Sequence, residues 1–84
     1  MAEVIIYTRQ MCSYCSAAKA LLTQKGVGFT EHDASFNAQL RAEMTQKSGR
    51  STFPQIFIGG THIGGFDDMN ALNRAGSLDA LLNA

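Results

Sequence analysis

The sequence predicts an α/β fold in which a four-stranded mixed sheet is flanked by helices. Strand-like and helix-like segments alternate through the first two thirds of the chain, a tight hairpin pattern follows, and two helical patterns complete it. Alternation of strands with helices favours parallel pairing, and the hairpin adds an antiparallel pair. We therefore expect the order β-α-β-α-β-β-α-α in a single domain spanning residues 1–84.

The first expected elements are a strand, a helix and a second strand. Residues 4–7 form a nearly continuous apolar, β-branched run, which is typical of a strand buried on both faces. Residues 14–25 carry one apolar stripe at helical spacing, and Gly26 is a natural helix stop. Residues 28–32 fit a second strand.

A second helix is expected over residues 37–48, closed by Gly49. Leu40 and Met44 lie one turn apart and define its inner face, to which we also assign Phe36. This helix would cover part of the sheet.

The hairpin pattern consists of two apolar runs, 55–58 and 61–63, separated by Gly59 and Gly60. Two glycines supply the positive φ angles that a tight primed turn requires. Beyond it, Asp67 is expected to cap a third helix that ends at Gly76. Ser77 is expected to cap a last short helix. The apolar residues of these helices are Met69, Leu72, Leu78, Leu81 and Leu82.

Charge and hydropathy exclude several classes of protein. Seven basic residues balance seven acidic ones, so the chain has no basic surface that would mark nucleic-acid binding. No apolar run approaches the roughly 18–20 residues of a membrane span. Residues 1–3 lead directly into the first strand, so we expect no secretory signal and a cytoplasmic location. In that setting a close pair of cysteines indicates catalysis or metal binding.

The two cysteines, Cys12 and Cys15, lie between the first strand and the first helix. Unpaired N–H groups at a helix N-terminus and the helix dipole favour a thiolate, the dipole by roughly 0.3–2 kcal/mol. The cation Arg9 adds to this effect. Cys15 lies one turn further in, so it should be more buried and protonated. We expect Cys12 to be the attacking thiolate and Cys15 the resolving thiol.

Two other roles for the cysteine pair remain open. A zinc site would need two more ligands, and the only histidines, His32 and His62, lie on predicted strands without a ligand partner at close spacing. Inert structural thiols are the other alternative. A close pair in a βαβ setting favours redox chemistry over both.

The only proline, Pro54, precedes the third strand. Proline at the start of a strand has a plain steric explanation. Together with the cysteine pair, we favour a cis Phe53–Pro54 bond, which would leave the backbone of Phe53 facing the cysteines. An extended peptide could then pair with it as an antiparallel strand.

Three motifs now resemble the glutaredoxin family, in particular the short bacterial dithiol glutaredoxins. They are YTRQMCSYC at 7–15, TFPQIFIG at 52–59 and IGGFDD at 63–68. The resemblance covers essentially the whole chain, and the family has a thioredoxin-like fold, which agrees with the element order predicted above.

The resemblance implies which residues would bind the glycine and cysteinyl units of glutathione. Arg9 and Arg41 would meet its glycine carboxylate. Phe53 would pair main chain to main chain with its cysteinyl unit, beside Thr52 and Pro54. For each arginine, a solvated surface charge is the alternative interpretation.

The resemblance also implies a binding site for the γ-glutamyl end of glutathione. Its carboxylate would take helix N–H groups near Gly65 and Phe66, and its ammonium group would take the side chain of Asp67 or Asp68. Tyr14 would flank the mixed disulfide. The alternatives are that Asp67 is only a helix cap and that Phe66 and Tyr14 serve ordinary packing.

The sequence departs from the family pattern at two positions. Ser13 replaces the usual proline between the cysteines, and relatives lacking that proline can hold a 2Fe–2S cluster between two protomers, using the first cysteine of each and two glutathiones. Cys12 is thus an alternative cluster ligand. Arg9 stands where lysine is usual, which keeps the charge but changes its geometry.

The implied activity is a glutathione-dependent thiol–disulfide oxidoreductase. The expected partners are glutathione, proteins carrying mixed or internal disulfides and, indirectly, glutathione reductase. Nucleic acid and membranes are not expected partners. The chain should be a monomer, and a dimer only with a cluster. A redoxin reduced directly by a flavoprotein reductase is the rival interpretation.

Overall fold

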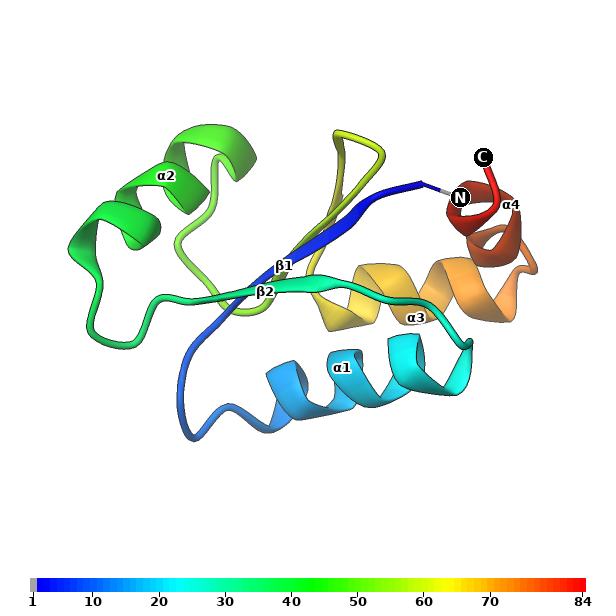
Figure 1. The fold of residues 1–84 in the computed structure, drawn as a ribbon, viewed down its shortest axis with the longest axis horizontal. Coiled ribbons are helices and arrows are strands. Elements are labelled where there is room, and N and C mark those ends of the chain that lie inside the picture. The colour runs from blue at the N-terminus through cyan, green and yellow to red at the C-terminus, as the bar shows by residue number, and fades with distance from the viewer. Residues whose placement is uncertain (1) are drawn as a thin grey trace.

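One four-stranded sheet with helices packed against it organises the chain, as the sequence predicts (Figure 1). The computed structural model describes residues 2–84. The strands are β1 (Val4–Thr8), β2 (Thr30–Asp33), β3 (Gln55–Ile58) and β4 (Thr61–Gly64), and the helices are α1 (Ser13–Gln24), α2 (Ala38–Ser48), α3 (Phe66–Arg74) and α4 (Leu78–Leu82).

The strand order is β2-β1-β3-β4. β1 is parallel to β2 and antiparallel to β3, and β3 is antiparallel to β4. The turn between β3 and β4 consists of Gly59 and Gly60, whose φ angles of 59° and 83° explain why both positions are glycine. The mixed sheet predicted from the element order is therefore confirmed.

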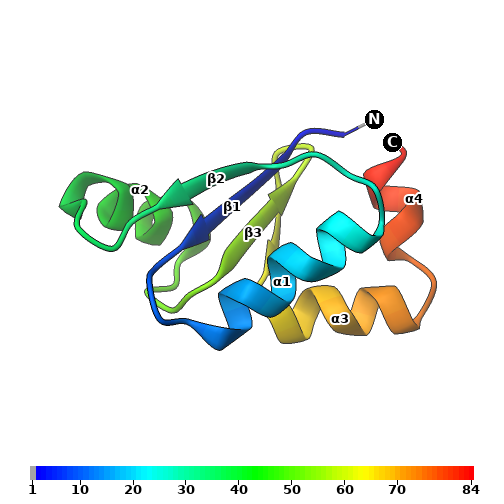
Figure 2. The ribbon, with the colours of Figure 1, turned by 60° about the horizontal axis from the view of Figure 1, so that its bottom comes forward.

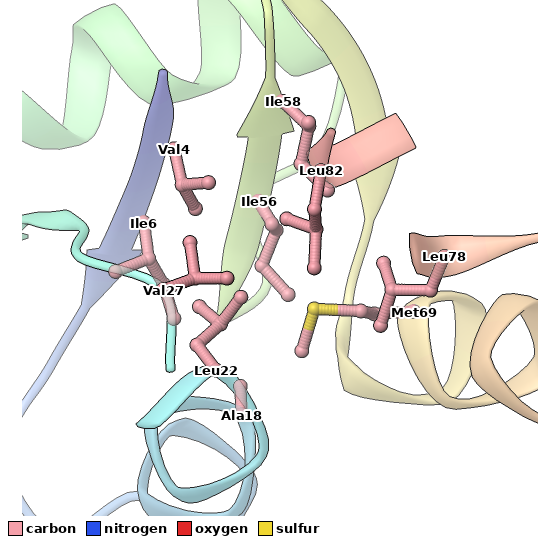
Figure 3. Close-up of a cluster of buried hydrophobic side chains, with 10 residues drawn as sticks. All are labelled: Val4, Ile6, Ala18, Leu22, Val27, Ile56, Ile58, Met69, Leu78 and Leu82. Carbon is pink, nitrogen blue, oxygen red and sulfur yellow. The ribbon is translucent and has the colours of Figure 1, made fainter. Parts of the chain in front are cut away.

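The larger hydrophobic core lies between the sheet and the layer formed by α1, α3 and α4 (Figures 2 and 3). Strand residues alternate between the two faces, so Ile56 and Ile58 enter this core while Phe57 points to the other side. There, Phe57 packs with Tyr7 and with Met44 of α2 in a smaller cluster. The larger core contains Val4, Ile6, Ala18, Leu22, Val27, Ile56, Ile58, Met69, Leu78 and Leu82.

The expected inner-face position of Phe36 is wrong. This side chain is 88% exposed and precedes the helix, which begins at Ala38 with Asn37 as its N-cap. The Asn37 side chain accepts a hydrogen bond from the backbone N–H of Leu40 at 3.0 Å. Helical periodicity does not extend beyond the cap, so it could not place Phe36.

The expected caps of the last two helices also need correction. The N-cap of α3 is Gly65 rather than Asp67, because the third helical residue, Asp68, accepts the Gly65 N–H at 2.9 Å. Ser77 occupies the N-cap position of α4, but its side chain makes no capping hydrogen bond. The second strand begins at Thr30, two residues later than predicted.

The two ends of the described chain lie side by side (Figure 1). The backbone N–H of Ala2 donates to the carbonyl oxygen of Leu82 at 3.0 Å. Ala2 precedes β1 and the cysteine loop follows it, so the ends meet at the opposite end of this strand from Cys12. Within residues 2–84, no helix has both the length and the hydrophobicity that a membrane crossing needs.

Candidate active site

Sheet topology brings two distant loops together at one end of the sheet. β1 and β3 are antiparallel, with Tyr7 opposite Gln55, so the loop that follows β1 lies beside the loop that precedes β3. Cys12 Sγ lies 3.9 Å from the carbonyl oxygen of Phe53. The Phe53–Pro54 peptide bond is cis, as the sequence predicts.

Cys12 is the N-cap residue of α1. Its Sγ accepts a hydrogen bond from the backbone N–H of Cys15 at 3.2 Å, and the residue is 8% exposed. An N–H group aimed at the sulfur and the positive end of the helix dipole both favour a negative charge there. Cys12 is therefore largely buried, and its sulfur accepts a hydrogen bond from the first turn of α1.

Cys15 is the more buried thiol of the pair, at 2% exposure, as predicted. Burial and, second, the hydrogen bond with Cys12 raise its pKa to about 12. Cys15 is therefore a thiol at neutral pH, and the two sulfurs differ in environment although they are three residues apart. Both are free cysteines.

A groove of about 190 Å³, which we name the α3 groove, begins beside Cys12 at Phe53 and Tyr14. The rings of Tyr14 and Phe66 stack along it with centroids 6.4 Å apart. Eight of the residues that the sequence analysis assigns to substrate binding line it, together with one that it missed, Arg50. The lining residues are Tyr14, Arg50, Thr52, Phe53, Pro54, Gly65, Phe66, Asp67 and Asp68.

The two aspartates of the α3 groove have different surroundings. The Asp68 carboxylate accepts hydrogen bonds from the Gly65 N–H at 2.9 Å and from Arg50 Nη1 at 3.1 Å. These contacts, the backbone bond first, hold the pKa of Asp68 below its ordinary value. Asp67 is exposed in the first turn of α3. Asp68 therefore holds the groove together, and Asp67 is the more accessible carboxylate.

Gly64, which ends β4 beside the α3 groove, has no room for a side chain. Its φ is +119°, and a Cβ atom added there would lie 2.3 Å from Oδ2 of Asp68. A residue with a side chain would thus displace the carboxylate that caps α3.

Comparison of the sequence with known proteins identifies one family. The family model for glutaredoxin matches residues 4–63, which is most of the chain. The chain belongs to the glutaredoxin family. It is 55% identical over 84 residues to a glutaredoxin of Pseudomonas aeruginosa, covering 100% of both chains, and 56% identical over 82 residues to glutaredoxin 3 of Escherichia coli K12, covering 98% of this chain and 99% of that one.

Solved glutaredoxin structures share the fold. The solution structure of glutaredoxin from Brucella melitensis is 61% identical, with a TM-score of 0.86, and the match covers 98% of this chain and 89% of that one. A crystal structure of a buckwheat glutaredoxin–glutathione complex is 30% identical, with a TM-score of 0.89, covering 98% and 77%. The thioredoxin-like fold is thereby confirmed, and family membership implies thiol–disulfide oxidoreductase chemistry.

The two arginines expected to meet a carboxylate lie apart from the α3 groove of this glutaredoxin. Arg9 lines a second groove of about 490 Å³, which also includes Cys12 and Cys15. Arg41 lines neither groove, because its Nη1 donates to the carbonyl oxygens of Ala34 at 2.9 Å and Ser35 at 3.2 Å. The structure thus brings Arg9, but not Arg41, to the cysteines.

Metal ligands do not converge in the part of the glutaredoxin that the structure describes. Within residues 2–84, no group of three or more His, Cys, Asp or Glu side chains could hold a metal ion. His62 Nε2 lies 2.7 Å from Gln55 Oε1, and His32 packs against the ring of Tyr7. The described part of one copy therefore holds no zinc site built around the cysteine pair.

Replacing Asp68 with asparagine should lower the free energy of unfolding by roughly 0.5 kcal/mol at neutral pH. The folded-state pKa of Asp68 lies below its ordinary value of 3.8, so the unfolded chain binds the proton first as the pH falls. The stabilising contribution is complete above the unfolded pKa and is lost as the pH falls through the folded pKa. Urea denaturation midpoints of wild type and variant should converge in that acid range. A difference that stays constant with pH would contradict the assignment.

Proposed function

We propose that this glutaredoxin is a glutathione-dependent oxidoreductase that reduces protein–glutathione mixed disulfides and protein disulfides. The observation that carries the proposal is the position of Cys12. Its sulfur receives the Cys15 N–H, faces the backbone of Phe53, and borders a groove with complementary charged groups at its far end. A related buckwheat glutaredoxin has been crystallised as a glutathione complex, which supports the same ligand here.

The first step is a displacement at sulfur. The Cys12 thiolate attacks the glutathione sulfur of a mixed disulfide, a Cys12–glutathione disulfide forms, and the protein leaves as a thiolate that takes a proton from water. A second glutathione thiolate then attacks the glutathione sulfur held on Cys12. This releases glutathione disulfide and restores the Cys12 thiolate, so one disulfide is consumed and one is produced.

Protein disulfides are reduced by a second route that uses Cys15. The Cys12 thiolate forms a mixed disulfide with the substrate protein, and Cys15, after losing its proton, attacks the Cys12 sulfur. The substrate leaves as a dithiol and a Cys12–Cys15 disulfide remains, which two glutathiones reduce. Because burial raises the pKa of Cys15 to about 12, Cys15 is the resolving thiol and does not compete for the first attack.

The α3 groove matches the γ-glutamyl end of glutathione. The backbone N–H groups of Phe66 and Asp67, in the first turn of α3, have no intrahelical acceptor and suit the α-carboxylate. Asp67 suits the ammonium group, because the Asp68 carboxylate is already bound to Gly65 and Arg50.

In the proposed complex, the cysteinyl and glycine units of glutathione would lie beside the loop that carries Cys12. The cysteinyl unit would pair with the backbone of Phe53, between Thr52 and Tyr14, and the glycine carboxylate would meet Arg9. Arg41 keeps its two carbonyl partners and contributes only its charge at longer range.

The proposed reaction depends on the glutathione pool. Glutaredoxin potentials of roughly −200 to −230 mV lie close to an extracted cytosolic glutathione poise of roughly −220 to −260 mV, so the site can run in either direction. We propose a cytoplasmic location, because the proposed reaction needs a pool of reduced glutathione. Glutathione reductase acts only indirectly, by restoring reduced glutathione.

Replacing Asp67 with alanine tests the proposed ligand. The KM for a glutathionylated peptide should rise about fivefold to tenfold, equivalent to roughly 1–1.4 kcal/mol, because the ammonium group loses its carboxylate. The turnover is measured with glutathione and glutathione reductase, following NADPH oxidation. Asp79→Ala removes the same charge from α4 and should leave the KM unchanged. An unchanged kcat/KM for Asp67→Ala would contradict the assignment of Asp67 to the ammonium group. If glutathione cannot reduce the wild-type protein, the result would favour a redoxin that a flavoprotein reductase reduces directly.

The second candidate function is 2Fe–2S cluster binding. A solved structure named "Metal Binding of Glutaredoxins" is 61% identical to this chain, with a TM-score of 0.74, and the match covers 98% of this chain and 89% of that one. One copy of this chain does not supply four cluster ligands, so Cys12 could hold a cluster only in a dimer completed by two glutathiones. Anaerobic purification with glutathione tests this function: a dimer with visible absorption supports it, and a colourless monomer contradicts it.

A further inference from the structure

Gln55 is a polar side chain in a fully buried position of the sheet. It is 0% exposed and opens the central strand β3, with Tyr7 of β1 opposite. A buried amide is costly unless its donors and acceptor are paired. Within residues 2–84, no buried side-chain nitrogen or oxygen lacks a hydrogen-bond partner, so Gln55 is fully accommodated.

The partners of Gln55 fix the orientation of its amide. Nε2 donates to the backbone oxygen of Thr52 at 3.0 Å and to Thr52 Oγ1 at 3.1 Å. A carbonyl oxygen can only accept, so the nitrogen must face Thr52 and the amide oxygen must face His62. His62 Nε2, 2.7 Å from that oxygen, therefore carries a proton and donates.

The segment that Gln55 holds is the one that faces the reacting sulfur. Thr52 is exposed and precedes Phe53, whose carbonyl oxygen lies 3.9 Å from Cys12 Sγ. Two hydrogen bonds from a rigid strand thus fasten the chain one residue away from the proposed contact with glutathione. Displacements of about 1 Å in such a contact can cost as much as 10²-fold in kcat/KM.

We infer that Gln55 is a positioning residue of the proposed reaction: its amide places the Thr52–Phe53 backbone against the cysteinyl unit of glutathione. This inference rests on the proposed function. Gln55 itself does not touch the groove, so it acts only through Thr52. His62 pairs with the oxygen of the amide, whereas both bonds to Thr52 come from its nitrogen.

The test replaces Gln55 with methionine, which has nearly the same shape and cannot donate. The KM for a glutathionylated peptide should rise at least tenfold while kcat stays within twofold. The rate at which iodoacetamide alkylates Cys12 should also stay within twofold, because the bond from the Cys15 N–H is untouched. His62→Phe keeps an aromatic ring beside Phe57 and both bonds to Thr52, so its KM should change less than threefold.

The outcomes separate this inference from the proposed function. If wild type turns over the peptide but Gln55→Met has a KM within twofold of wild type, the positioning role is wrong. The positioning role is also wrong if kcat, KM and the rate of Cys12 alkylation all change together, because a general structural defect would produce that pattern. If wild type shows no glutathione-dependent turnover, the proposed function itself fails. Should the variant not fold, hydrogen exchange in wild type decides: a Gln55 side-chain amide that exchanges as fast as in a free peptide overturns the role, and a protected one supports it.

Discussion

Replacing Cys12 with serine should abolish turnover of a glutathionylated peptide, with a loss of at least about 10³-fold. Replacing Cys15 with serine should leave this turnover within about threefold of wild type. Cys12 carries the attacking sulfur in both proposed routes. Cys15, buried and with a pKa raised to about 12, enters only after a protein disulfide has been opened. The assay is glutathione-dependent NADPH oxidation with excess glutathione reductase.

A protein disulfide substrate provides the control for this asymmetry. With it, Cys15→Ser should lose more than tenfold, because the mixed disulfide on Cys12 has no resolving thiol. Mass spectrometry should then detect the trapped protein adduct. Equal losses for the two variants on the glutathionylated peptide would contradict the route in which Cys12 acts alone.

Replacing Gly64 with alanine should lower the free energy of unfolding by about 2–4 kcal/mol and raise the KM for the glutathionylated peptide at least tenfold. The added Cβ would lie 2.3 Å from Oδ2 and 2.7 Å from Cγ of Asp68, and φ is +119°. The carboxylate must therefore move, and it loses its bonds to Gly65 and Arg50. Urea denaturation and steady-state kinetics measure the two effects.

Gly26→Ala is the matched control for this prediction. Gly26 also has a positive φ, +73°, but a Cβ there would meet nothing within 4 Å. The substitution should cost only the left-handed strain of about 1–2 kcal/mol and leave the KM unchanged. If both variants lose the same stability and keep the wild-type KM, Gly64 has no special part in the α3 groove.

Local patterns were sufficient to predict most of the fold. The apolar runs of the strands, the helical stripe after Cys15 and the paired glycines of the hairpin each depend on neighbours in the chain. The errors lie at element ends, where capping hydrogen bonds decide which residue begins a helix. Phe36 falls outside α2 because Asn37 caps it, and α3 begins before Asp67 because the Asp68 carboxylate reaches back to Gly65.

The candidate site was predictable where a motif carries it and not elsewhere. Cys12, Cys15 and the Thr52–Pro54 segment belong to motifs, and the structure brings them together. Arg50 lies outside the motifs and was missed, because its partner Asp68 is far along the chain. Gln55 lies inside the motif at 52–59 but was given no role, because its partner His62 lies across the sheet. Arg41 was expected to meet the glycine carboxylate of glutathione. In the structure it donates to the carbonyl oxygens of Ala34 and Ser35, a direction of a long side chain that no sequence pattern reveals.

The bond between Ala2 and Leu82 has a practical consequence for protein engineering. Because the first and last described residues adjoin each other away from the cysteines, this chain can be inserted into a loop of a host protein through two short connectors. Under the proposed function, a fluorescent host built in this way would report the redox state of glutathione, with the connectors at the opposite end of β1 from Cys12.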